Sequence, residues 1–281
     1  MTWMLSGVLG IAVVVLGLSG LGRWRWAAKT RMLLDRLQAG CSSAAAGHFD
    51  PDELDGLPAP VARYLRAVIP AGTPIIRSVE VVQRGSLNLS DTAERWRPFT
   101  SRQHVVTRRP GFVWDARVSM GPGLAVYVYD AYVAGEGILE PALLGLFPLA
   151  RLRDRGEGAR GELMRFMAEA AWYPTALLPG QGMHWEPLDA HSARATLVDG
   201  ELRLALSFHF GADGLLERVR AENRGRMAGG ALIPTPWEGC LSNYQWRDGL
   251  LIPLDGEVAW LTPAGWRPYW RGTITALRYQ R

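Results

Sequence analysis

The hydrophobic pattern begins with an uninterrupted apolar run near the N-terminus. Residues 3–22 contain no charged side chain and are rich in Leu, Val and Ile. About 20 apolar residues in a helix span the hydrocarbon layer of a bilayer. The run therefore predicts a single transmembrane anchor over residues 1–22, through which the protein contacts a membrane. A cleaved signal peptide is the alternative, but it needs basic residues before a shorter apolar core, and here the basic residues follow the run.

Three later segments follow the helical period. Residues 23–50 predict a basic juxtamembrane helix, over Ala27–Leu37, followed by a linker of small residues. Apolar residues recur at i, i+3, i+4 and i+7 in Val61–Val68, which predicts a short helix with one buried face. A longer helix is predicted over Gly161–Tyr173, because its apolar and charged residues fall on opposite faces and Pro174 ends it.

Elsewhere in residues 51–281 the apolar residues alternate with a period of two, which predicts β-strands. Turn sequences such as Asp199-Gly200 favour tight hairpins, and strands joined by tight turns are antiparallel. We therefore predict a mainly β fold, with residues 51–281 as a single β-rich domain. Its curved antiparallel sheet, or open half-barrel, encloses the helix of Gly161–Tyr173 and is preceded by the N-terminal transmembrane helix. The predicted strands are Ile75–Leu89, Trp96–Arg108, Phe112–Ser119, Leu124–Val133, Met183–Leu188, Ala193–Val198, Leu202–Phe210, Leu215–Asn223, Trp237–Trp246, Glu257–Leu261 and Tyr269–Tyr279.

The net charge of the chain, +4, comes from the segment that follows the apolar run. Residues 23–36 hold five basic side chains and one acidic side chain, whereas residues 41–281 hold 26 of each sign. A nucleic-acid-binding protein needs a basic face on its folded domain, so nucleic acid is excluded as a partner. Basic residues on the C-terminal side of a span favour a cytoplasmic domain in a single-pass membrane protein. Trp24 and Trp26 fit the headgroup level, where indole rings collect.

Four motifs of the β-rich domain carry a resemblance to a known family: Leu57–Leu65, Arg109–Arg117, Gly161–Pro174 and Pro236–Glu238. They resemble a widespread bacterial family of membrane-anchored domains of unknown function, over roughly residues 55–280. That family has no established activity, so the resemblance implies the fold and its extent. More loosely, a curved antiparallel sheet around a helix resembles the LolA/LolB-like lipoprotein carriers, whose concave face accommodates acyl chains. This second resemblance rests on architecture, which hosts many functions.

The sequence contains none of the common catalytic motifs. It has no G-x-S-x-G, no G-x-x-x-x-G-K-[ST] and no H-E-x-x-H, and its two cysteines form no disulfide framework. His184, His191 and His209 lie on predicted neighbouring strands, where three imidazoles are able to converge on a metal. Isolated histidines on strands are more often surface residues, so we predict no metal and no cofactor.

Acidic residues beside aromatic rings suggest acid/base chemistry as an alternative. Burial against a ring raises the pKa of a carboxyl group and suits it to proton transfer. A hydrolase or isomerase would then use the candidates Asp115, Glu169 and Glu238. Alternation along a strand instead places the ring of Trp114 or Trp237 inward and the neighbouring carboxylate outward. Glu169 is also spaced to pair with a basic residue on its own helix, Arg165.

The Trp content is the remaining feature with functional meaning. Nine of the twelve Trp residues lie in the β-rich domain, where they either fill the core or line a pocket. We interpret the protein as a non-enzymatic, membrane-anchored binder of a hydrophobic ligand or lipid in an aromatic-lined cavity. A membrane-tethered interaction scaffold is a further alternative, for which the apolar Ile138–Leu149 stretch would form an exposed loop. The predicted lining residues are Trp114, Trp172, Tyr173, Trp185 and Trp237.

Overall fold

A computed structural model gives the fold of the chain. It describes the backbone of residues 2–40, 47–90 and 93–281, and the side chains of these ranges from residue 17 onward. The α-helices are α1 (Thr2–Ala39), α2 (Ala59–Val68) and α3 (Glu157–Ala168), and the 3₁₀ helices are η1 (Pro51–Leu54), η2 (Glu169–Trp172), η3 (Pro174–Leu177) and η4 (Pro179–Gln181). The strands are β1 (Ser78–Asn88), β2 (Trp96–Val106), β3 (Gly111–Gly121), β4 (Leu124–Val133), β5 (Glu136–Leu143), β6 (Phe147–Pro148), β7 (Leu152–Asp154), β8 (His184–Asp189), β9 (Ser192–Asp199), β10 (Leu202–Phe210), β11 (Leu216–Ala228), β12 (Ala231–Arg247), β13 (Leu250–Thr262) and β14 (Gly265–Gln280).

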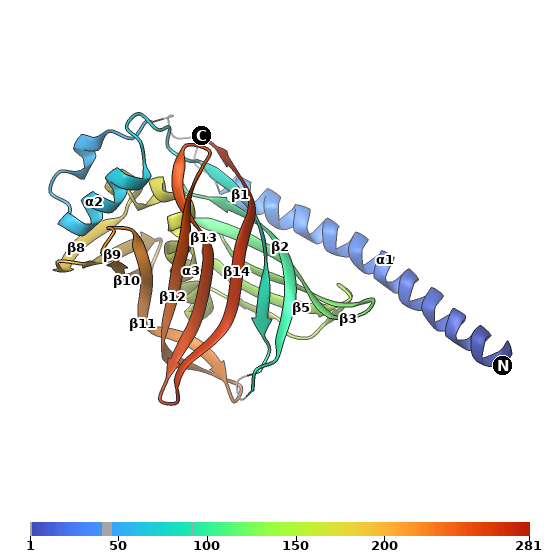
Figure 1. Ribbon diagram of the computed structural model, residues 1–281. Helices are drawn as coiled ribbons and strands as arrows, with labels where there is room; N and C mark the ends of the chain where they lie inside the picture. Colours follow the sequence, from blue (N-terminus) through green and yellow to red (C-terminus); the bar gives the residue numbers. More distant parts are fainter. Residues whose placement is uncertain (1, 41–46, 91–92) are drawn as a thin grey trace.

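All the strands belong to one antiparallel sheet. Its order is β6-β5-β4-β3-β2-β1-β14-β13-β12-β11-β10-β9-β8, and β7 pairs with β5 off this path. Because β1 pairs with β14, the first and last strands meet in the middle of the sheet. The sheet curves without closing, and α3 lies inside the curve, in contact with β4 and β5 toward one end and with β10 and β11 toward the other (Figure 1). The predicted mainly β fold, an open antiparallel sheet around a helix, is therefore confirmed.

Strand alternation divides the side chains between the two faces of this sheet. Trp114 on β3 and Asp130 on β4 are direct neighbours across the strands and point inward, toward α3. Their neighbours Asp115 and Tyr129, also paired across the two strands, point to the outer face. The inner face holds the main hydrophobic core, and α1 covers part of the outer face with a second, smaller core.

The C-terminal half of α1 packs on the outer face of β3, β4 and β5. Trp26 stacks on Tyr129 with ring centroids 3.9 Å apart and donates from Nε1 to Asp115 Oδ1 at 2.9 Å. Thr30 Oγ1 donates to the other oxygen of Asp115, also at 2.9 Å. Burial raises the pKa of Asp115, although these two hydrogen bonds oppose the rise. The expected headgroup position of Trp26 was therefore wrong, since its side chain is only 6% exposed, while Trp24 is 66% exposed.

Ion pairs and a close backbone approach fix the same helix at other points. Lys29 pairs with Glu140 of β5, and Arg36 Nη2 lies 2.9 Å from Glu136 Oε2. At Gly22 a Cβ atom would collide with the carbonyl oxygen of Leu144 in the β5–β6 turn, so only glycine allows this approach. The helix predicted over Ala27–Leu37 is therefore a part of the folded structure.

The N-terminal half of α1 extends away from the sheet (Figure 1). Its backbone is helical from Thr2, but most of the predicted span, residues 1–16, lies outside the described side chains. Within the described residues, no helix is long and apolar enough to cross a membrane. The transmembrane anchor over residues 1–22 thus remains a prediction. Most of the predicted linker, residues 41–46, also lies outside the described residues.

Several element boundaries differ from the prediction. Ile138–Leu149, predicted as an exposed loop, instead contributes to β5 and β6, and Ile138 is fully buried on the outer face. The strand predicted over Glu257–Leu261 extends to Leu250–Thr262 and includes Pro253, which lies opposite Tyr244 of β12. The helix around α3 begins earlier than predicted and continues as the 3₁₀ helix η2 after Ala168.

Candidate ligand-binding pocket

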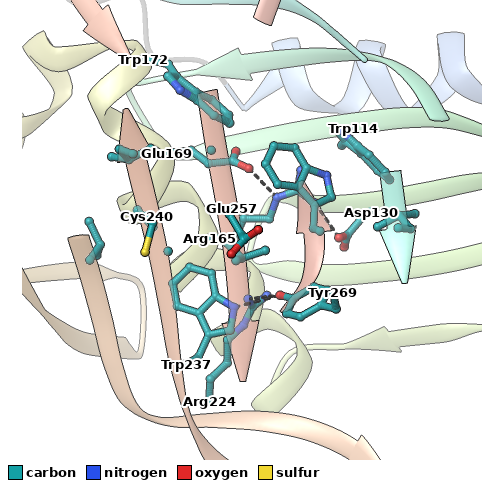
Figure 2. Close-up of a pocket in the computed structure, with 18 of the residues that line it drawn as sticks. Trp114, Asp130, Arg165, Glu169, Trp172, Arg224, Trp237, Cys240, Glu257 and Tyr269 are labelled. Carbon is teal, nitrogen blue, oxygen red and sulfur yellow. Dashed lines mark hydrogen bonds and ion pairs between the residues drawn. The ribbon is translucent and has the colours of Figure 1, made fainter. Parts of the chain in front are cut away.

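A pocket lies between α3 and the inner face of the sheet. Its volume is about 180 Å³. An apolar cavity of about 150 Å³ holds benzene, so this pocket has room for a ring or a segment of an acyl chain. Apolar and aromatic side chains from both arms of the sheet form its walls (Figure 2). They are Leu87, Trp114, Val128, Leu139, Trp172, Val219, Trp237, Leu241, Val258 and Trp270.

Glycines create part of this space. Gly256 of β13 and Gly272 of β14 are direct cross-strand neighbours. A Cβ at Gly272 would collide with the indole of Trp270, and a Cβ at Gly256 would lie 3.3 Å from the same ring. At Gly239 of β12 a Cβ would meet its nearest atoms at 3.4 Å, which is ordinary contact. Thus the glycines of β13 and β14 accommodate Trp270, and Gly239 leaves room within the pocket.

Arg165 of α3 holds two carboxylates beside the pocket. Its Nε lies 2.7 Å from Glu169 Oε1, and its Nη1 lies 2.6 Å from Asp130 Oδ2 (Figure 2). Gln103 Nε2 donates to the second oxygen of Glu169 at 2.6 Å. Burial alone would lower the pKa of Arg165, but the Glu169 and Asp130 charges outweigh burial and raise it. Arg165 therefore remains charged, and a buried charge needs such partners.

Glu162 lies on the preceding turn of α3, and its carboxyl group has a strongly shifted pKa. Burial first, and then the charge of Asp130, raise the pKa of Glu162 well above its usual value. In the described part of the chain, Asp130 Oδ1 and Glu162 Oε2 are buried without a donor when both groups are ionised. A proton shared between the two carboxyl groups would supply that donor. Burial and the Asp130 charge therefore favour the neutral form of Glu162 in the folded protein.

Arg224 of β11 is the second guanidinium of the pocket. A register shift between Ala221 and Arg224 leaves two exposed residues between them and returns Arg224 to the inner face. Its guanidinium lies 4.8 Å from the ring centroid of Trp237, and its Nη1 donates to the Tyr269 hydroxyl at 3.3 Å. Trp237 Nε1 donates to the same hydroxyl at 2.8 Å (Figure 2). Arg224 thus forms part of the wall, with its aromatic neighbours holding it in place.

Three of the predicted lining residues, Trp114, Trp172 and Trp237, do line this pocket. The predictions for Tyr173 and Trp185 were wrong, because both serve the core. Tyr173 is fully buried and donates its hydroxyl to the Phe166 carbonyl at 2.7 Å. Trp185 packs edge-on against an aromatic ring of β10 and donates Nε1 to the Leu177 carbonyl at 2.9 Å.

The three predicted acid/base residues do not come together. Glu169 lines the pocket, but it is paired with Arg165. Asp115 lies on the outer face under α1. Glu238 does not line the pocket, although its neighbours Trp237 and Gly239 do, because alternation along β12 directs its side chain away from that of Trp237. These three carboxylates therefore do not form the single acid/base site on which the hydrolase or isomerase alternative rested.

Asp130, Glu162 and Arg224 were absent from the predicted site. A charged residue at the inward position of an otherwise apolar strand could have indicated Asp130. Glu162 falls on the charged face of the predicted helix, but the sheet meets this face around Glu162, whose side chain is only 15% exposed. Arg224 follows the predicted end of its strand and reaches the pocket through a bulge that the period-two pattern does not contain.

The histidine alternative and a metal site find no support in the described chain. His184 and His191 are exposed. In the described ranges, no group of three or more His, Cys, Asp or Glu side chains is placed to hold a metal ion.

The fold and the pocket define an antiparallel open-sheet protein with an internal helix and an apolar, aromatic pocket beside buried ion pairs. The chain belongs to the family of unknown function DUF6920, whose model matches residues 55–279. This confirms the resemblance to a domain family of unknown function. No curated protein matches the sequence.

Solved structures show a partial likeness. An outer-membrane lipoprotein-sorting protein domain from Vibrio parahaemolyticus is 14% identical, with 72% of this chain and 85% of that chain covered and a TM-score of 0.38. A DUF1329 family protein from Desulfovibrio piger is 12% identical, with 73% of this chain and 86% of that chain covered and a TM-score of 0.37. A LolA superfamily protein from Nitrosomonas europaea is 11% identical, with 79% of this chain and 93% of that chain covered and a TM-score of 0.34. The looser predicted resemblance thus reappears among these structures, at identities and scores too low to indicate a shared ligand.

Proposed function

We propose that this protein is a non-enzymatic carrier or sensor that binds a hydrophobic ligand, a lipid acyl chain, in the pocket beside α3. The observation that carries the proposal is the pocket itself, which four Trp side chains and several aliphatic ones line. Apolar space with few convergent polar groups is the usual form of a ligand site. Burying an acyl chain there is favourable because it removes apolar surface from water.

We also propose that residues 3–22 tether the protein to a membrane, with the domain on the cytoplasmic side. The uncharged run followed by a basic segment supports this orientation. Trp24 on α1 and Phe147 and Leu149 beyond the β5–β6 turn are exposed, and Gly22 packs on that turn. Exposed aromatic and aliphatic side chains beside basic ones suit the interface of a bilayer. The pocket would then lie near a source of lipid.

A photoactivatable fatty acid with a diazirine near the end of its acyl chain tests both parts of the proposal. The full chain is labelled in native membranes and the modified peptides are mapped by mass spectrometry. We expect label on residues 3–22 from the bilayer, and label on the pocket-lining segment Trp237–Leu241 from bound ligand. Absence of label on residues 3–22 would contradict the tether.

The Gly239→Leu variant is the matched control for the pocket. A leucine there fits its nearest neighbours at the Cβ but fills space that the pocket otherwise leaves open. Label on the pocket segment should fall in the variant while label on residues 3–22 stays the same. If the wild-type pocket segment takes no more label than the variant, ligand binding in this pocket is wrong.

A further inference from the structure

Arg224 is a buried cation with little compensation from the protein. The residue is 8% exposed and lines the pocket. Among the described residues, the only carboxylate within 4 Å of its guanidinium belongs to Glu162, and the gap from Nη2 to Oε1 is 3.8 Å, too long for a hydrogen bond. Its hydrogen bond within the described chain goes to the Tyr269 hydroxyl. A guanidinium has five N–H donors, so most of its donor capacity is unused.

Arg165 shows how the same protein satisfies a buried guanidinium. Glu169 and Asp130 approach it at 2.7 and 2.6 Å from two directions. The carboxyl group beside Arg224 is different, because it lies 3.8 Å away and makes no hydrogen bond with the guanidinium, and because burial and Asp130 raise the pKa of Glu162. Arg165 is therefore compensated by two anions. Arg224 has aromatic neighbours instead, and these stabilise a cation only weakly.

The other acidic groups around the pocket do not compensate Arg224, because each faces a different arginine. Asp130 and Glu169 both face Arg165, and Glu257 pairs with Arg271. Trp172 Nε1, another pocket-lining group, is a buried donor that has no acceptor within the described chain. Figure 2 shows Trp172 and Arg224 toward opposite ends of the pocket. Asp130 Oδ1 is also buried without a partner in the described chain, but Arg165 compensates the charge of this carboxylate through Oδ2. The pocket-lining groups with unused donors, Arg224 and Trp172, therefore lie toward its two ends.

We propose that the pocket is specific for anionic amphiphiles, with the carboxylate or phosphate headgroup held by Arg224 and the apolar tail lying among the Trp side chains. This rests on the proposed function, since it names the class of ligand for the same pocket. An anionic oxygen would accept the free N–H groups of Arg224 in an environment where charge-assisted hydrogen bonds are strong. A cationic headgroup would meet Arg224 with repulsion, and a neutral one would leave the guanidinium uncompensated.

The test compares ligands that share one octyl tail and differ in the headgroup. Octanoate, octyl phosphate, octanol and octylamine are titrated by calorimetry into the full chain in lipid nanodiscs, with empty nanodiscs and the Gly239→Leu variant as blanks. We expect octanoate or octyl phosphate to bind about 10- to 100-fold more tightly than octanol, the range that a charged hydrogen bond supplies. Octylamine should bind most weakly. The ratio of octanoate to octyl phosphate distinguishes a free fatty acid from a phospholipid headgroup as the source of the anion.

The Arg224→Met variant removes the charge and keeps an unbranched side chain of similar length. It should reduce the affinity for the two anions to that for octanol, and leave octanol binding unchanged, whereas Arg224→Lys should retain part of the preference. Equal binding of octanol and octanoate to the wild type, or an anion preference that survives in Arg224→Met, overturns the headgroup assignment but not the pocket. Tightest binding of octylamine also overturns it. If no octyl ligand binds better than to the Gly239→Leu blank, the proposed function itself fails. The wild-type series decides the question even if Arg224→Met does not fold.

Discussion

The raised pKa of Glu162 makes the stability of this protein depend on pH, and Glu162→Gln should remove this contribution to the dependence. The carboxyl group lies on α3 against Asp130 of β4, Arg165 of its own helix and Arg224 of β11. An amide has nearly the same shape, remains neutral at every pH, and is able to donate to Asp130 as the protonated acid does.

The sign and size of the effect follow from proton linkage. Because the pKa of Glu162 is raised in the folded state, the folded protein keeps a proton that the unfolded chain releases above its usual value of 4.5. The contribution to stability is complete below that value and is lost as the pH rises toward the folded pKa. Within this window, the free energy of unfolding falls by about 1.4 kcal/mol for each pH unit. Asp115 also has a raised pKa, but it is present in both proteins and cancels in their difference.

Urea unfolding of the full chain in non-ionic detergent, followed by far-ultraviolet circular dichroism, measures this difference between about pH 5 and pH 8. The stability of Glu162→Gln relative to the wild type should increase with pH at about 1.4 kcal/mol per unit until the folded pKa is reached. Glu157→Gln, an exposed change in the first turn of the same helix, should show no such trend. Parallel curves for the wild type and Glu162→Gln would refute the assignment of a bound proton.

Two further substitutions test other parts of the structure. Trp26→Ala removes a buried ring and one donor to Asp115, so α1 should lose about 3–5 kcal/mol of docking free energy. Hydrogen exchange should then become faster over residues 26–37, while Trp24→Ala, an exposed change, leaves it as it was, and equal protection in both variants would contradict the packing. Arg165→Met leaves two carboxylates without their cation and should lower the free energy of urea unfolding by about 3–5 kcal/mol. A loss no larger than that of the partly exposed Arg160→Met would show that the cluster around Arg165 does not stabilise the fold.

Period and turn chemistry were enough to predict most strands and the two helices of the domain, but not β5, β6 and β7. The helix at Val61–Val68 has its predicted buried face, and the hairpin at Asp199-Gly200 joins β9 and β10 as its sequence requires. The same reasoning put the rings of Trp114 and Trp237 on the inner face, because alternation along a strand is a local property. The ion pair between Arg165 and Glu169 was also predictable, since residues four apart on a helix are neighbours.

The charged part of the pocket was not predictable in this way. A helical period tells which residues share a face, but it does not tell what that face meets. Part of the polar face of α3 meets the inner side of a curved sheet, so Glu162 is largely buried there and its pKa is raised, although its spacing from Arg165 is that of a surface ion pair. Asp115 shows the converse case, because the partner that buries it is Trp26, distant in the sequence.

By itself, the sequence determined that the chain has an apolar N-terminal run with a basic segment after it, and a curved antiparallel sheet around one helix. These properties arise from local spacing and from the short turns between strands. Only the tertiary structure decided that α1 packs on the outer face, that Tyr173 and Trp185 support the core, and that Arg224 enters the pocket. The physical reason is that burial and charge compensation depend on which distant elements pack together, and a shift of one residue at a bulge is enough to move a side chain from solvent to the interior.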